Sequence, residues 1–154
     1  MSDLIYMKIE GEHQSLISKN ASSLLSIGNK SQFGHEDECQ VIHVNSSAYR
    51  DLATNTGHMS VSKLIDGATP LLSLALNNGE KLNIEISFYR HTGVQSYDLY
   101  FKTIIQKAYV TQQNIIMGNQ SSESDHETLT IRYTDIRHNH VTSNSHGYIL
   151  WSNE

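Results

Sequence analysis

Two short segments of the sequence gather residue types that commonly bind metals. In the first, RHNHV, His138 and His140 stand two residues apart, and His126 and His146 lie on either side at no motif spacing. Alternate residues of a strand share a face, so the central pair could bind one ion. A zinc site needs further ligands in a defined geometry. We interpret the segment as a polar strand end, with a metal-dependent hydrolase as the alternative.

The second segment, GHEDEC, contains the acids that this hydrolase would use and the single cysteine. On an extended chain either His35, Asp37 and Cys39 converge, or Glu36 and Glu38 do. Acidic neighbours do not favour the thiolate, so we expect no cysteine nucleophile. The sequence also lacks a G-x-S-x-G motif, a glycine-rich phosphate loop and a CxxC pair. We therefore expect a solvated loop here, no cofactor and no enzyme activity.

Composition limits the class of protein. The 154 residues fit one domain, residues 1–154, with 38% hydrophobic and 18% charged residues. A net charge of −5 argues against a nucleic-acid partner. No run approaches the roughly 20 apolar residues of a membrane helix, so we expect no membrane insertion. The N-terminus has no basic, apolar leader, which predicts synthesis in the cytoplasm and export, if any, without a cleavable signal.

Alternating and β-branched segments predict a mainly β fold. In residues 82–89, Leu82, Ile84, Ile86 and Phe88 should point inward. In residues 58–66, Met59 and Val61 should point inward and Lys63 outward. Further strands are expected at 4–11, 39–44, 94–117 (two strands or one bent strand), 128–141 and 147–153. The pattern indicates a small antiparallel β-barrel or sandwich with one flanking short α-helix.

The helix is expected over residues 69–77. Thr69 can cap it, Pro70 suits its first position, and Gly79 suits a left-handed end. Leu71 and Leu74 share a face with Ala75, so we expect both leucines to pack on the core.

Residues 45–58 are polar and are expected to form a long loop. Loops of this length in compact domains are usually functional. It contains Tyr49, Arg50, Asp51 and Leu52, a mixture suited to a polar interface with an aromatic anchor. We expect these four residues to contact a partner.

The stretch LIDGATPLLSLALNNGEKLNIEISFYR resembles the strand–helix–strand centre of the haemolysin-coregulated protein (Hcp) family of bacterial type VI secretion. The matching residues are Ile65, Asp66, Thr69, Pro70, Leu71 and Leu72. Upstream, Ser26–Asn29 and Gly34–Asp37 are similar to the enterobacterial branch, and GYILWSNE is similar to the closing strand of the family. The resemblance extends over essentially the whole chain.

This resemblance implies a fold, partners and a location. Family members are small β-barrels with one helix that form hexameric rings, and the rings stack into a tube under a spike protein inside a sheath. The tube is secreted and its lumen carries small effectors. The loop at residues 45–58 is similar to the one that reaches the next ring. One departure is the polar segment Arg137–His140, which would face a subunit interface or the lumen. The sequence ends soon after the closing strand, so we expect no fused toxin. A monomeric β-barrel binding module remains a further alternative.

Overall fold

The computed structural model describes residues 3–50, 54–93, 96–119 and 125–150. Within these ranges it has nine strands, two α-helices and one 3-10 helix. The elements are β1 (Leu4–Gly11), β2 (Ser15–Leu16), α1 (Leu24–Ile27), η1 (Gly28–Lys30), β3 (Cys39–Arg50), β4 (Thr54–Lys63), α2 (Thr69–Asn78), β5 (Leu82–Gly93), β6 (Ser96–Ile116), β7 (His126–Arg132), β8 (Asp135–His140) and β9 (Ser145–Leu150). The mainly β expectation is confirmed, and α1 and η1 lie where only loop was predicted.

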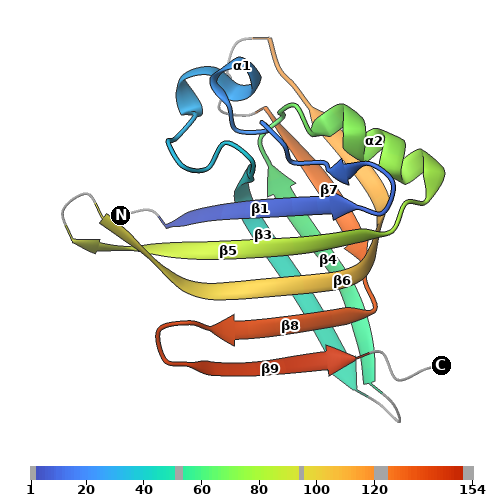
Figure 1. Ribbon diagram of the computed structural model, residues 1–154. Helices are drawn as coiled ribbons and strands as arrows, with labels where there is room; N and C mark the ends of the chain where they lie inside the picture. The colour runs from blue at the N-terminus through green and yellow to red at the C-terminus, as the bar shows by residue number, and fades with distance from the viewer. Residues whose placement is uncertain (1–2, 51–53, 94–95, 120–124, 151–154) are drawn as a thin grey trace.

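Strand pairing closes the sheet into a barrel. β1 pairs with both β3 and β5, β5 pairs with β6, β6 with β7, β7 with β4, and β4 with β3, all antiparallel. β8 and β9 extend the sheet outward from β6. Figure 1 shows β1, β5, β6, β8 and β9 as one layer, crossed by a second layer of β3, β4 and β7, with α2 over one end. Closure leaves few unpaired edges.

One bent strand, β6, joins the two layers. Its first part, up to Ala108, pairs with β5 and β8, and its second part, from Tyr109, pairs with β7. Lys107, at the junction, has the left-handed φ of 55°. A single residue in this region turns a strand locally. The sequence had allowed two strands or one bent strand, and the structure has the second.

The core follows the predicted alternation on β5. Leu82, Ile84 and Ile86 are buried, and they pack with apolar side chains from β1, β4, β6 and β7. On β4 one expectation was wrong: Lys63 is buried on the same face as Met59 and Val61. Its position in the alternation had indicated this, and only its charge had placed it outside.

Helix α2 begins and ends close to the predicted residues but is rotated from the predicted orientation. Gly79 closes it with φ 59°, as expected, while Ala68 rather than Thr69 occupies the N-cap. Thr69, Leu72 and Ala75, spaced three apart, face the barrel and are buried. Leu74 is 45% exposed and Leu71 is also exposed, so the expectation that both pack on the core is wrong.

The described part of the predicted loop at residues 45–58 is strand instead. β3 continues to Arg50 and pairs with β4 from its first residue, Thr54, with a register shift between Ser46 and Ala48. At this shift a Cβ on Gly57 would collide with Ser47, and the Tyr133 hydroxyl donates to the Ser47 carbonyl at 3.4 Å. Strand pairing satisfies the main chain whatever the side chains are, so polar residues do not prevent it.

A buried carboxylate closes the turn after β1. Oε2 of Glu80 accepts the main-chain N–H groups of His13 and Gln14, both at 2.8 Å, and its Oε1 accepts the Gln14 side-chain amide at 2.8 Å. Burial alone would raise the pKa of Glu80, but the hydrogen bonds from Gln14 and His13 outweigh it and hold the pKa below its ordinary value. A Cβ on Gly11 would collide with this carboxylate, so glycine is required there.

Candidate assembly surfaces

The β3–β4 hairpin projects from the barrel. Figure 1 shows the end of β3 and the start of β4 reaching past β9. Every residue from Asn45 to Arg50 is exposed, and Tyr49 is 62% exposed. Tyr49 and Arg50 pair with Asn55 and Thr54 on β4. The other two residues predicted to contact a partner, Asp51 and Leu52, lie outside the described residues. The hairpin therefore carries an aromatic side chain away from the core, where nothing in the described chain covers it.

A second surface is apolar and lies on the segment around α1. Leu24 and Leu25, consecutive on α1, are 70% and fully exposed, and Phe33, in the segment after η1, is 98% exposed. Exposed apolar side chains of this size can mark a contact with another chain. The contact residues predicted from the sequence, at positions 49–52, do not include these three.

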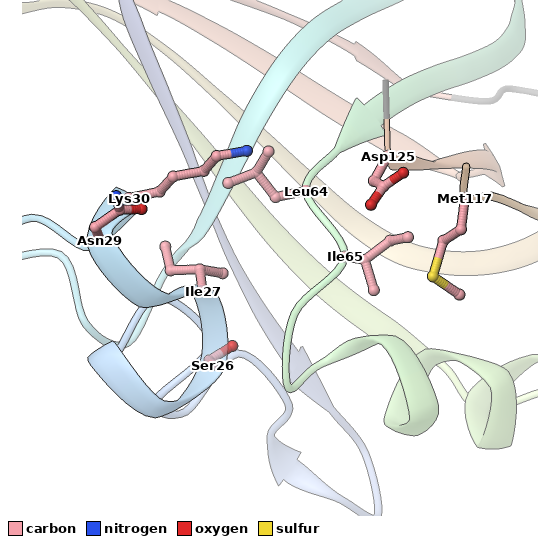
Figure 2. Close-up of a pocket in the computed structure, with 8 residues that line it drawn as sticks. All are labelled: Ser26, Ile27, Asn29, Lys30, Leu64, Ile65, Met117 and Asp125. Carbon is pink, nitrogen blue, oxygen red and sulfur yellow. The ribbon is translucent and has the colours of Figure 1, made fainter. Parts of the chain in front are cut away.

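A cavity of about 330 Å³ lies next to this surface. Figure 2 shows Ile27 and Lys30 on the side of α1 and η1, Leu64 and Ile65 on the connection after β4, and Met117 with Asp125 beyond them. Half of its lining is apolar, from Ile27, Leu64, Ile65 and Met117, and half is polar, from Ser26, Asn29, Lys30 and Asp125. It could receive an apolar residue of another chain.

A buried ionic network joins α2 to the barrel. The Lys63 ammonium lies 2.7 Å from Glu127 Oε1 and 2.9 Å from Asp66 Oδ1, and all three side chains are fully buried. The Thr69 hydroxyl accepts the Asp66 N–H at 3.1 Å and donates to Glu127 at 2.8 Å. The Gln113 amide donates to Glu127 Oε2 at 2.5 Å and to the Thr69 carbonyl at 3.1 Å. Asp66 and Thr69, part of the predicted helix motif, thus fix the rotation of α2.

The electrostatics of this network are those of a structural site. Burial alone would lower the pKa of Lys63, but the acidic groups of Cys39, Asp66 and Glu127 raise it above its ordinary value. Burial raises the pKa of Asp66 despite the opposing effect of Lys63. Burial also raises the pKa of the Cys39 thiol well above its ordinary value. A thiol held neutral and away from solvent is a poor nucleophile.

The histidines of RHNHV face different partners. His138 stacks on Phe101, with centroids 5.6 Å apart, and its Nδ1 lies 3.0 Å from the Thr103 hydroxyl. Burial lowers the pKa of His138. His140 Nδ1 accepts from Ser143 in the turn to β9. His146 is paired with Asn139, so its side chain lies on the opposite face of the sheet.

The acidic segment is a turn with Gly34, Glu36 and Asp37 exposed, which agrees with the predicted solvated loop. His35 Nδ1 lies 2.7 Å from Glu38 Oε1, and the His35 ring stacks on Tyr6 at 3.9 Å. Asp37 accepts the Asn20 N–H at 2.9 Å, while Cys39 enters the core. In the described part of the chain, no three His, Cys, Asp or Glu side chains lie close enough to hold a metal ion. In the described residues, the histidines of RHNHV and the acids of GHEDEC, which the metal-dependent hydrolase would use, therefore do not form one metal site.

Membrane insertion has no helical element to support it in the described ranges, where no helix has the length and apolar character to cross a bilayer.

Comparison with known proteins identifies the family. The sequence model described as "Type VI secretion system effector, Hcp" matches residues 6–140. The chain is 30% identical over 166 residues to "Major exported protein" of Pseudomonas aeruginosa, covering 98% of this chain and 96% of that protein. It is 32% identical over 147 residues to "Uncharacterized protein YhhZ" of Escherichia coli K12, covering 94% of this chain but only 37% of that protein's length.

Solved structures agree over the full length. "Crystal structure of Hcp protein" superimposes with a TM-score of 0.91 at 26% identity, covering 99% of this chain and 100% of that one. "Secreted protein Hcp3 from Pseudomonas aeruginosa" gives a TM-score of 0.88 at 29% identity with the same coverage. The relative from Escherichia coli agrees with the resemblance to the enterobacterial branch. Because sequence and fold match the same family over nearly the whole chain, the chain belongs to the Hcp family of type VI secretion system proteins.

Proposed function

We propose that this protein is the building block of a type VI secretion tube, in which identical subunits form a hexameric ring and rings stack. The observation that carries the proposal is the family match over residues 6–140, together with structural agreement over 99% of the chain. The role is structural rather than enzymatic.

The exposed surfaces suit such an assembly. A ring made of one subunit uses heterologous contacts, in which each surface is covered by a different surface of the next copy. The apolar group of Leu24, Leu25 and Phe33 supplies one such surface, and the cavity beside it can take a side chain from a neighbour. Burying these side chains in a ring would remove the largest apolar exposure near α1.

The hairpin suits a different contact. It extends away from the barrel and exposes Tyr49 and Arg50 at the end of β3. In the proposal these residues, with Asp51 and Leu52, lie against the next ring and support stacking. The spike, the sheath and small effector proteins are the other partners, and the protein is made in the bacterial cytoplasm and secreted by the system.

Native mass spectrometry and negative-stain imaging test the ring. We expect a hexamer for the wild type and a shift to smaller species for Phe33→Asp. Thr142→Asp, in the exposed turn between β8 and β9, is the matched control for an added charge. If the wild type is only a monomer at tens of micromolar, the proposed function fails. If Phe33→Asp still forms rings, only the assignment of this surface fails.

A deletion tests the hairpin. Removing residues 48–54 should leave the barrel and its thermal unfolding intact, because Ala48, Tyr49 and Arg50, the part of β3 that is removed, are exposed. It should impair tube stacking and secretion. Tyr49→Ala should weaken the stacking of rings. Tyr49→Phe is the control, because it keeps the aromatic side chain. Secretion of the deletion at the wild-type level would remove the hairpin from the mechanism.

A further inference from the structure

A cleft of about 500 Å³ lies on the solvent face of the β6–β8–β9 sheet. Its walls come from the polar segment Arg137–His140 of β8 and from β9. The lining residues are Ile104, Arg137, Asn139, His146, Gly147 and Tyr148, with His138 beside them. This volume is within the range of sites that hold a small ligand or a few residues of peptide.

The strand register explains why these side chains meet. Ile104 pairs with Arg137, and Arg137 with Tyr148, so the three form one row across three strands. Asn139 pairs with His146 in the next row on the same face. Directly opposite side chains in antiparallel strands lie about 4.5–5.5 Å apart at Cβ. The two rows therefore form the walls of the cleft.

The floor lies between the rows. His138 and Gly147 are paired with each other, and alternation turns them to the opposite face, where His138 stacks on Phe101. The strand backbone between the two rows is therefore the floor, and a ligand can approach the strands closely.

The charge of the cleft is its most informative property. Arg137 is exposed and makes no ion pair with any carboxylate in the described part of the chain. No acid lines the cleft, although the chain as a whole carries a net charge of −5. By contrast, a cleft over β5 contains four acids and two lysines: Glu36, Asp37, Glu38, Glu85, Lys8 and Lys102. An arginine without a partner beside an amide and an exposed tyrosine ring provides two-point recognition of a carboxylate next to an apolar contact.

We propose that this cleft, built on Arg137, Asn139 and Tyr148, binds an acidic polypeptide segment of a partner protein. A Glu or Asp carboxylate of the segment accepts hydrogen bonds from the Arg137 guanidinium, and an adjacent aromatic or aliphatic side chain packs on Tyr148 and Ile104. The site goes beyond tube assembly and does not require a ring, so it can be tested on the protein in any oligomeric state.

Fluorescence anisotropy with a labelled hexapeptide, Gly-Phe-Glu-Phe-Glu-Gly, tests the proposal. The comparison peptide has glutamine in place of each glutamate. We expect the glutamate peptide to bind at least about tenfold more tightly, the factor that about 1.4 kcal/mol of charge-assisted hydrogen bonding represents. Arg137→Gln and the isosteric Asn139→Asp, which places a carboxylate beside the guanidinium, should each weaken binding about tenfold.

Arg90→Gln is the matched control, since Arg90 is exposed, packs on Tyr100 and does not line the cleft. It removes the same charge and should leave peptide binding unchanged. Equal binding of both peptides would overturn the proposal, and so would equal loss in the Arg90 and Arg137 variants. If Arg137→Gln alters the oligomeric state and leaves peptide binding unchanged, a second copy covers the cleft and the proposal fails, while the proposed tube function stands.

Discussion

The buried ammonium of Lys63 allows a comparison of two ion pairs that differ chiefly in burial. Lys63 and Glu127 are 2.7 Å apart and fully buried, whereas Lys102 and Glu85 are also 2.7 Å apart but 27% and 40% exposed. Removing one partner of a buried pair leaves an uncompensated charge and costs about 3–5 kcal/mol. An exposed pair contributes about 0–1 kcal/mol.

Each of the two lysines is replaced by methionine, which keeps most of the side-chain volume. For a chain of this size each kcal/mol lowers the melting temperature by about 2–4 °C. Lys63→Met should therefore lower it by about 6–20 °C, and Lys102→Met by at most about 4 °C. Thermal unfolding followed by circular dichroism measures the melting temperatures of both variants. All samples need the same protein concentration, because assembly also changes the melting temperature.

Two further measurements separate charge from packing. Adding Asp66→Asn and Glu127→Gln to Lys63→Met should recover part of the lost stability, because no buried charge remains. Burial raises the pKa of Asp66 and Lys63 opposes that rise, so in Lys63→Met the Asp66 pKa rises further and the buried charge is neutralised at a higher pH than in the wild type. The gap between variant and wild type should therefore narrow as the pH falls. Equal, small shifts for Lys63→Met and Lys102→Met would refute this account of the network.

Four other substitutions test the fold. Leu72→Asp should prevent folding or lower stability by several kcal/mol. Leu74→Asp should change the unfolding free energy of the barrel by less than about 1 kcal/mol. If thermal unfolding shows that both variants lose the same stability, the observed rotation of α2 is contradicted. Glu80→Gln should lower stability by about 1.5–3 kcal/mol near neutral pH, since it removes a charged acceptor. The folded pKa of Glu80 is held low by hydrogen bonds from residues 13–14, so its contribution is present above its unfolded pKa and lost as the pH falls through the folded pKa. If the difference in stability between wild type and Glu80→Gln does not depend on pH, the ionised Glu80 carboxylate is not the source of that stability. Gly57→Val should loosen the hairpin base by about 1–3 kcal/mol, seen as faster amide hydrogen exchange there, and unchanged exchange would show that the close approach has no structural role.

The periodicity of the sequence was sufficient to predict the mainly β class, the inward face of β5 and the extent of α2. These features depend on local rules: side chains alternate along a strand, and Pro70 and Gly79 restrict where a helix begins and ends. The resemblance carried by Asp66, Thr69 and Pro70 also led to the correct family.

The sequence misled where polarity was taken as a sign of loop and where charge was taken as a sign of exposure. The polar residues 45–50 form strand because pairing with β4 satisfies their main chain, and a single sequence does not show its pairing partner. Lys63 was assigned to the surface, although two residues that follow later in the chain, Asp66 and Glu127, compensate its charge in the core. Only the fold places Glu127, 64 positions away, beside it.

The rotation of α2 and the meeting of side chains in the clefts were likewise decided by tertiary structure. Leu71, Leu72, Leu74 and Ala75 are all apolar, so periodicity alone left the buried stripe ambiguous, and the Thr69 hydrogen bond to Glu127 selected it. In the same way RHNH suggested a metal site until the register with β9 placed His146 on the opposite face from His138. Local propensity follows from the sequence itself, whereas burial of a charge and convergence of distant side chains depend on which strands become neighbours.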